Sequence, residues 1–288
     1  MDYNRIVVCR GGGDLATGII HRLAKAGLQV VCLESERPSS IRRQVCFSEA
    51  VYDGETSVDG MKAVRVKNME DILTAWQKRE VPVLIDPKGE WIEELKPVAV
   101  VDAIIAKKNL GTYKDMAPLT IGVGPGFTAG ADVDVVIESM RGHSLGRVIT
   151  KGAAIANTGI PGKVGGYDKE RVIHASGAGY MKNISKIGDQ VEKGQIIAEI
   201  YEDLSMTGER VPVKATLNGI LRGLIRTGYR VSKGFKIADI DPRKEELENC
   251  FTISDKARCI AGSVLEVICS KLMEENSSLF FGRNPDEA

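Results

Sequence analysis

Near its amino terminus the chain reads Arg5-Ile6-Val7-Val8-Cys9-Arg10-Gly11-Gly12-Gly13-Asp14-Leu15-Ala16-Thr17-Gly18. A β-branched apolar run, a glycine turn and a helical pattern follow one another here, and residues 28–33 then read as a second apolar strand. This order predicts a strand–helix–strand unit, with Glu34 closing the second strand 23 positions after Gly11. The spacing is typical of a dinucleotide-binding fingerprint.

The glycine turn predicts an anion-binding loop. Small residues at positions 11, 13 and 16 let the backbone turn tightly and approach a phosphate, while the helix amino terminus points free N–H groups at it. Glu34 would accept a hydrogen bond from a ribose hydroxyl. The candidate nucleotide- or cofactor-binding residues are Arg10, Gly11, Gly12, Gly13, Asp14, Leu15, Ala16, Thr17, Gly18, Glu34 and Arg37. The alternative is a plain crossover whose glycines only make a tight turn, and Asp14 inside the loop departs from the usual pattern.

Two continuous apolar runs, 81–85 and 98–101, are typical of buried parallel strands and end in Asp86 and Asp102. Ligands bind outside the carboxyl ends of such strands, so Asp102 joins the candidate site. Asp86 precedes a proline, and we expect it to cap the following turn. A second glycine-rich loop follows residues 119–123, and we expect it to form a second wall of the crevice. That wall would comprise Lys107, Lys108, Gly124, Gly126, Phe127 and Thr128. The alternative is a wide turn between strands.

The second half of the chain contains an internal repeat. Residues 173–200 align with 213–240 at a shift of 40, with nine identities in 28 positions. Each copy reads as strand, glycine turn, strand, Gly-x-x-Val-x-Lys-Gly and a final short strand, which resembles the half-motif of biotinyl and lipoyl carrier domains. The stretch that joins the copies, 202–209, has no lysine to carry such a cofactor, so neither biotin nor lipoate is expected.

The composition excludes several classes of partner. Lysine and arginine total 39 residues and so do aspartate and glutamate, which leaves no net charge to attract nucleic acid or an anionic membrane. No apolar stretch approaches the ~18 residues of a membrane span, and the first residues lack a secretory signal, so we expect a cytoplasmic protein. Six cysteines without a Cys-x-x-Cys and three scattered histidines predict structural thiols and no metal site.

Five stretches together carry a resemblance to a known family: residues 10–18, 107–109, 122–130, 141–143 and 239–243. They are similar to the YqeB family, accessory proteins of the selenium-dependent molybdenum hydroxylase system, whose nucleotide-type half is similar to the Rossmann portion of XdhC-type proteins. The resemblance runs from Ile6 to about Leu272. It implies a molybdenum hydroxylase or a cofactor-handling protein as partner. It also implies a small anionic ligand, either an NAD(P)-like nucleotide or the molybdenum cofactor.

Three functions stay open on the sequence. The first is a maturation factor that binds a nucleotide or a molybdenum-pterin ligand at the Gly11–Gly18 loop. The second is a non-enzymatic scaffold for hydroxylase assembly. The third is an NAD(P)-dependent oxidoreductase with His143 as acid or base. The residues do not decide whether a reaction is catalysed, and a homodimer is compatible with each function.

The expected fold class is α/β plus β. A length of 288 residues is about twice the usual single domain. We expect a Rossmann-like parallel-sheet domain over 1–150, which includes the glycine-rich middle loop. A biotinyl/lipoyl-like (barrel-sandwich hybrid) domain built from the repeat would span 151–245, and a C-terminal helix and tail would span 246–288.

Overall fold

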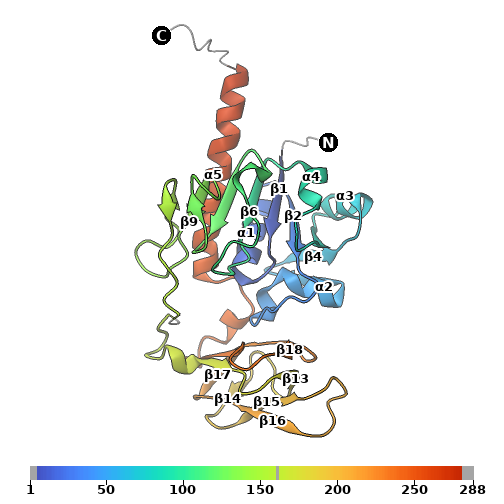
Figure 1. The fold of residues 1–288 in the computed structure, drawn as a ribbon, viewed down its shortest axis with the longest axis vertical. Helices are drawn as coiled ribbons and strands as arrows, with labels where there is room; N and C mark the ends of the chain where they lie inside the picture. The colour runs from blue at the N-terminus through green and yellow to red at the C-terminus, as the bar shows by residue number, and fades with distance from the viewer. Residues whose placement is uncertain (1–4, 160–161, 281–288) are drawn as a thin grey trace.

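The computed structural model describes residues 5–159 and 162–280. A body built on one large sheet lies above a smaller body of antiparallel strands (Figure 1). The elements of the larger body are β1 (Ile6–Arg10), α1 (Asp14–Lys25), β2 (Gln29–Glu34), α2 (Ala50–Asp53), β3 (Glu55–Val58), β4 (Met61–Arg65), α3 (Met69–Gln77), β5 (Val81–Ile85), α4 (Trp91–Leu95), β6 (Ala99–Asp102), β7 (Thr120–Val123), β8 (Thr128–Ala129), β9 (Val135–Ile137), β10 (Val148–Ile149) and β11 (Gly152–Ala153).

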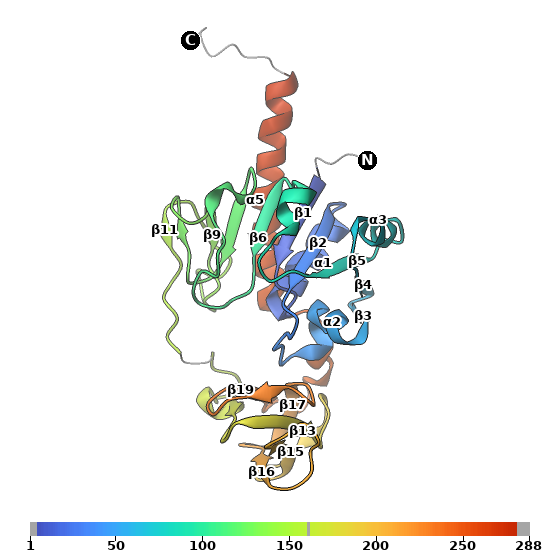
Figure 2. The same ribbon diagram turned by 45° about the vertical axis from the view of Figure 1, so that its right-hand side comes forward.

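The smaller body contains the internal repeat. Its strands are β12 (Val172–His174), β13 (Gly179–Asn183), β14 (Gln190–Val191), β15 (Ile196–Tyr201), β16 (Arg210–Lys214), β17 (Gly219–Leu224), β18 (Arg230–Val231) and β19 (Lys236–Asp241). The chain then returns to the larger body as the helix α5 (Asp255–Phe280), which passes behind the large sheet and extends beyond it (Figures 1 and 2). The predicted C-terminal helix thus begins at Asp255, while residues 281–288 of the predicted tail lie outside the described part of the chain.

The large sheet is mixed, in the order β10-β9-β7-β6-β1-β2-β5-β4-β3. Its inner strands are parallel, but β3 pairs antiparallel with β4 at one edge and β10 with β9 at the other. The prediction of a Rossmann-like parallel sheet is therefore wrong. The physical reason lies in the connections: β3 and β4 are joined by Asp59-Gly60, both at positive φ (46° and 74°), and so tight a hairpin imposes antiparallel pairing.

The predicted biotinyl/lipoyl-like domain is also corrected. The repeat forms two four-stranded antiparallel sheets, β12-β19-β17-β14 and β16-β15-β13-β18. Each sheet takes two strands from each copy, because β12 and β14 of the first copy pair with β19 and β17 of the second. In the other sheet, β18 and β16 of the second copy pair with β13 and β15 of the first. Apolar side chains from both sheets share one core, in which Met181, Ile197, Ile220 and Ile237 are fully buried.

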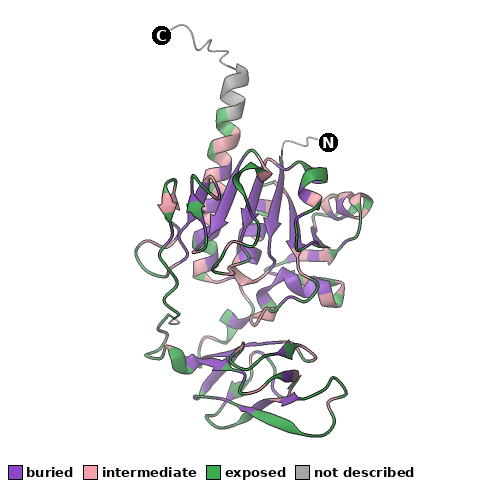
Figure 3. Cartoon of the chain, viewed as in Figure 1, coloured by how far each residue is buried: buried purple, intermediate pink, exposed green. Residues whose placement is uncertain are grey.

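Helix α1 packs between the sheet and α5. A Cβ at Gly18 would lie 2.7 Å from the Cβ of Ala257, so the absence of a side chain lets the two helices approach. One face of α5 contacts this core through apolar residues at three- and four-residue spacing: Ala257, Ile260, Ala261, Val264 and Ile268. The sheet strands are buried along most of their length, whereas β16 is largely exposed (Figure 3).

The two bodies meet where β17 lies against the segment 41–53. The amide of Leu224 donates to the carbonyl of Ile41 (2.9 Å), and the Nε of Arg43 donates to the carbonyl of Leu224 (2.7 Å). Arg226 adds ion pairs with Glu49 and Asp53. Backbone and charged contacts thus hold the repeat next to the carboxyl ends of β1 and β2.

Within the described residues, no helix combines the length and the hydrophobicity needed to cross a bilayer.

Candidate ligand-binding site

A cavity of about 590 Å³ opens at the carboxyl ends of β1, β2 and β6, where the sheet order changes direction. We call it the switch-point cavity. Its size is within the range of small-molecule sites. The larger body supplies most of the lining, and the repeat supplies one side chain, Lys236. The lining residues are Arg10, Gly11, Gly13, Asp14, Leu15, Leu33, Glu34, Ser35, Pro38, Ser39, Ser40, Ile41, Arg42, Asp86, Pro87, Ala103, Ile104, Ile105, Leu110 and Lys236.

The glycines of the predicted anion loop have different roles. Gly11 has a φ of +99°, and a Cβ there would lie 3.1 Å from the backbone of Ile104. A Cβ at Gly12 would lie 2.9 Å from the amide nitrogen of Ser48. Gly13 is open, since its Cβ would meet only the Oγ of Ser40, at 3.8 Å. Gly13 is therefore the position at which a ligand can approach the backbone, while Gly11 and Gly12 let the chain pack against itself.

The remaining loop residues divide between cavity and core. Leu15 lines the cavity, whereas Ala16 and Thr17 are buried beneath it. The hydroxyl of Thr17 donates to the carbonyl of Gly12 (3.1 Å) and accepts from the amide of Phe47 (2.9 Å). Thr17 therefore fixes the loop from below without facing a ligand.

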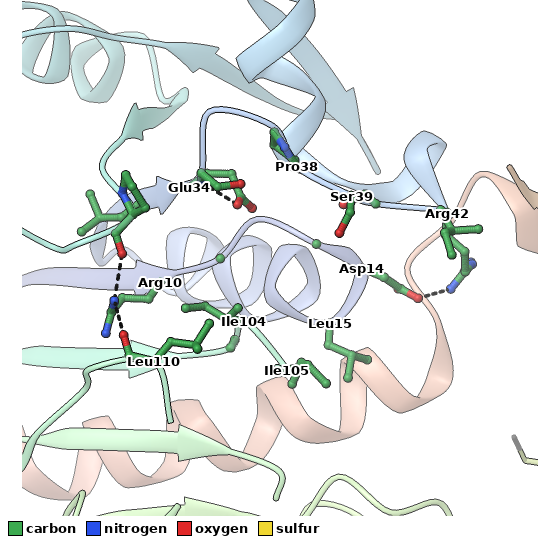
Figure 4. Close-up of a pocket in the computed structure, with 18 of the residues that line it drawn as sticks. Arg10, Asp14, Leu15, Glu34, Pro38, Ser39, Arg42, Ile104, Ile105 and Leu110 are labelled. Carbon is green, nitrogen blue, oxygen red and sulfur yellow. Dashed lines mark hydrogen bonds and ion pairs between the residues drawn. The ribbon is translucent and has the colours of Figure 1, made fainter. Parts of the chain in front are cut away.

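Asp14 is the residue that departs from the usual fingerprint, and the structure shows what it does. It is the first residue of α1, and its carboxylate accepts a hydrogen bond from Arg42 at 2.7 Å (Figure 4). A carboxylate is favourable at this end of a helix because of the helix dipole. Arg42 neutralises it, so the cavity wall carries no net negative charge from this pair.

Arg10 forms part of the rigid floor of the cavity. It is 2% exposed and donates to the carbonyl of Pro87 at 3.1 Å (Figure 4). It also lies 3.7 Å from a carboxylate oxygen of Asp102. Asp102 in turn accepts from the Thr112 hydroxyl at 2.6 Å. The Arg10 guanidinium and the Asp102 carboxylate thus both have partners within the protein. Asp102 holds Arg10 in place and does not itself line the cavity. Asp86 caps its turn as expected, accepting from the amides of Gly89, Glu90 and Trp91.

Glu34 is placed at the end of β2, as the sequence predicts, but it is tied to the loop backbone. One carboxylate oxygen accepts from the amide of Gly12 (2.8 Å) and the other from the amide of Ser35 (2.7 Å). Each oxygen accepts one hydrogen bond from the described residues, which leaves capacity for a ligand hydroxyl. Figure 4 shows Glu34, Pro38 and Ser39 on one side of the loop and the apolar residues Ile104 and Leu110 on the other.

Lys236 is the one lining residue from the repeat and was missed at the level of the sequence. Among the described residues its ammonium has no hydrogen-bond or ion-pair partner in the structure. Partial loss of hydration lowers the pKa of the Lys236 ammonium, and the nearby positive charges of Arg171 and Arg222 lower it further. The carboxylate of Asp239 has the opposite effect and raises this pKa. A signal was available, since the repeat alignment sets Lys236 opposite the apolar Ile196.

Several predicted site residues do not reach the switch-point cavity. Gly124 and Gly126 allow close backbone packing: a Cβ at Gly126 would lie 2.7 Å from the amide nitrogen of Lys108. Phe127 is buried against Gly122, and the amide of Thr128 donates to Asp132. The expected second wall is instead formed by Ala103, Ile104, Ile105 and Leu110. The predicted residues outside the lining are Gly12, Ala16, Thr17, Gly18, Arg37, Asp102, Lys107, Lys108, Gly124, Gly126, Phe127 and Thr128; His143 also lies outside it.

The cysteines near the loop are not placed for nucleophilic chemistry. Cys9, Cys32 and Cys46 are buried, and burial raises the pKa of each thiol, so they stay protonated at neutral pH. In the described part of the chain no group of three or more His, Cys, Asp or Glu residues is placed to hold a metal ion. The cavity therefore offers binding groups, and its own side chains do not form a recognisable catalytic set.

Comparisons with known proteins give one strong sequence match. The chain is 48% identical over 266 residues to the protein described as uncharacterized protein YqeB of Escherichia coli (strain K12). The match covers 92% of this chain and 47% of that protein, so the chain spans about half the length of the relative. No family model matches the chain.

The solved structures that match are of another kind. The ectoine utilization protein EutE (DoeB) of Ruegeria pomeroyi is 12% identical, with coverage of 82% and 85% of the two chains and a TM-score of 0.27. A succinylglutamate desuccinylase from Silicibacter sp. TM1040 is 11% identical, with coverage of 82% and 84% and a TM-score of 0.27. An aspartoacylase family protein of Mesorhizobium loti is 7% identical, with coverage of 83% and 87% and the same TM-score of 0.27.

At such TM-scores no activity is transferred to this chain. None of these neighbours is described as a Rossmann protein, a biotinyl/lipoyl-like domain or a factor for molybdenum hydroxylase maturation, so they lend no support to those three expectations. The sequence match is of a different quality, because it extends over nearly all of the chain. This identity supports the resemblance to YqeB over the part of that protein that the chain spans.

Proposed function

We propose that the protein is an accessory protein that binds a small anionic ligand, of nucleotide or pterin type, in the switch-point cavity. One observation carries the proposal: the open backbone at Gly13 and the unpartnered ammonium of Lys236 line the same cavity from different bodies of the molecule. The other cations of the lining, Arg10 and Arg42, have carboxylate partners within the protein, Asp102 and Asp14. Lys236 is therefore the cation available to a ligand phosphate.

The rest of the lining supports a ligand with a flat apolar part and hydroxyl groups. Ile104, Ile105 and Leu110 offer an apolar surface, while Glu34 and the serines at positions 35, 39 and 40 offer hydrogen-bonding groups. Pockets for cofactors commonly combine a mostly apolar wall with a few placed polar groups. A nucleotide has this combination, and so does a pterin with a phosphate.

Calorimetry on the full chain tests the proposal, with NAD⁺, NADPH, guanosine and cytidine nucleotides and a reduced pterin phosphate as probes. We expect one of these to bind, and Glu34→Gln to weaken it at least about tenfold, as expected for loss of a charged hydrogen-bond acceptor. Glu36→Gln is the matched control, because Glu36 is an exposed residue two positions on and does not line the cavity. Failure of every probe at millimolar concentration, or equal effects of the two variants, would refute the proposal.

The biological setting is a further part of the proposal and is supported by the family resemblance alone. We propose that the ligand serves the maturation of a selenium-dependent molybdenum hydroxylase in the cytoplasm, with the hydroxylase or a cofactor-handling protein as partner. The six cysteines are free thiols, as is usual in a reducing compartment. Deletion of the gene would then lower hydroxylase activity without lowering its abundance, and Glu34→Gln would fail to restore it. Full activity in the deletion strain would reject this setting.

A further inference from the structure

A second recess lies between the two bodies, at the start of α5, and it has a different chemical character from the switch-point cavity. Its volume is about 470 Å³, and its lining comes from the β9–β10 turn, the segment 163–165, β17, the segment between β19 and α5, and the first turn of α5. Five cationic side chains line it, Arg141, Lys163, Arg222, Arg243 and Arg258, against the two carboxylates of Glu246 and Asp255. We call it the cationic recess. The whole chain has 39 basic and 39 acidic residues, so the excess of positive charge in the cationic recess is local.

Three of the arginines already have partners. Arg141 makes a two-pronged ion pair with Asp255 (2.7 and 3.0 Å). Arg243 pairs with Asp241 (2.8 Å) and with Glu246 (3.2 Å), and Arg258 donates to a backbone carbonyl. The two carboxylates of the recess are thus both engaged, and neither is available to a further cation.

Arg222 differs from these. Its Nε is buried and has no hydrogen-bond partner, and none of the described residues forms an ion pair with its guanidinium. Burial lowers the pKa of Arg222 and the neighbouring Arg42 lowers it further, while the carboxylates of Asp239, Asp14 and Asp241 raise it without forming an ion pair with the guanidinium. A desolvated guanidinium without an acceptor costs free energy, which an oxyanion with two acceptor oxygens would recover.

The internal repeat provides a matched comparison. The residue equivalent to Arg222 in the first copy is Lys182, whose ammonium lies 5.4 Å from the centre of the Tyr201 ring and so has an internal partner. In the second copy the position of Tyr201 is taken by Asp241, which Arg243 engages. The second copy therefore departs from the repeat at both positions, and the departure leaves the Arg222 fork unmatched on the recess.

We propose that the cationic recess is a second anion site, which binds a phosphate or pyrophosphate group of a small molecule between the Arg222 fork and the neighbouring cations. The planar guanidinium suits two phosphate oxygens at once. The recess is large enough for a phosphate with a small organic group attached. Since it is built from both bodies, an occupant would also strengthen their association.

The test measures binding of inorganic pyrophosphate to the full chain by calorimetry at low and moderate salt. We expect millimolar or tighter binding, weakened at least about tenfold by Arg222→Met. Arg222→Lys, which keeps the charge and loses the fork, should give an intermediate value. Arg230→Met is the matched control, since it removes an exposed arginine from the same body outside the recess. Gly13→Val, which alters only the switch-point cavity, should leave pyrophosphate binding unchanged.

Unfolding in urea checks that Arg222→Met retains its fold, which we expect because the substitution removes a buried unsatisfied group. The proposal would be overturned if the wild type did not bind pyrophosphate at a concentration of about 10 mM. It would also be overturned if Arg222→Met and Arg230→Met weakened binding equally, or if Gly13→Val abolished binding. The last would place the anion in the switch-point cavity instead. None of these results would by itself remove the nucleotide proposal, which is tested separately with nucleotide and pterin probes and the Glu34→Gln variant.

Discussion

Adjacent glycines of the loop should respond differently to the addition of one methyl group. A Cβ at Gly12 would lie 2.9 Å from the Ser48 amide nitrogen and 3.0 Å from the Cys32 sulfur, both closer than ordinary van der Waals contact. Overpacking of this kind costs about 1–3 kcal/mol. The backbone of Gly12 is not at positive φ, so this cost is steric and not conformational.

At Gly13 the same methyl group has room. The nearest atom is the Ser40 Oγ at 3.8 Å, and the residue has a φ of −71°, which alanine adopts readily. Loss of unfolded-state freedom stabilises Gly→Ala by about 0.4–1 kcal/mol, and the poorer N-cap preference of alanine offsets a similar amount. We therefore expect Gly13→Ala to stay within about 0.5 kcal/mol of the wild type.

Urea unfolding followed by circular dichroism measures both variants. Gly12→Ala should lower the free energy of unfolding by about 1–3 kcal/mol and leave the cavity intact, while Gly13→Ala should be nearly neutral in stability and weaken ligand binding. Equal losses of stability in the two variants would refute the assignment of Gly12 to packing and Gly13 to ligand approach.

Three further predictions concern the contact between the bodies and the state of the side chains. Arg226→Met removes the ion pairs to segment 49–53, and because these are partly exposed we expect a loss of about 1 kcal/mol and faster proteolysis between the bodies; unchanged proteolysis would contradict this. Burial raises the pKa of Tyr52 to about 12, above an unfolded value near 10. The contribution of this phenol to the free energy of unfolding is therefore present below about pH 10 and is lost as the pH rises toward 12. Between about pH 9 and about pH 11, the free energy of unfolding should fall more for the wild type than for Tyr52→Phe. Equal falls in the two proteins would contradict this prediction. Alkylation of the native protein should modify the exposed Cys259 first, and mass spectrometry should find the buried thiols protected: Cys9, Cys32, Cys46 and Cys250.

Local patterns predicted many elements well. The run ending at Arg10, the helix after Gly13 and the strand ending at Glu34 all form, because apolar periodicity and glycine placement act within a few residues. Local capping acts over the same short range: Asn68 caps α3 by accepting from the amide of Asp71 at 2.9 Å. The errors concern arrangement: the direction of the edge strands and the way in which the two copies of the repeat exchange strands.

The candidate site was predicted only in part, for a related reason. Fingerprint spacing identified Gly11, Gly13 and Glu34, which the strand ends bring to one cavity. The same reasoning assigned the second glycine-rich loop to that cavity, although its glycines serve close backbone contacts with Lys108 and Ser139. A glycine required by packing and a glycine required by a ligand look alike in sequence, and only the neighbouring atoms distinguish them.

The sequence by itself determined the order of strands and helices, the existence of the repeat and the balance of charge. The tertiary structure alone decided which groups face one another across the two bodies. Lys236 and Gly13 are more than two hundred positions apart, and Arg222 and Asp255 belong to different elements, yet each pair lines a shared cavity. Their proximity depends on how β17 docks on the segment 41–53, and long-range packing of this kind leaves no periodic signal in the chain.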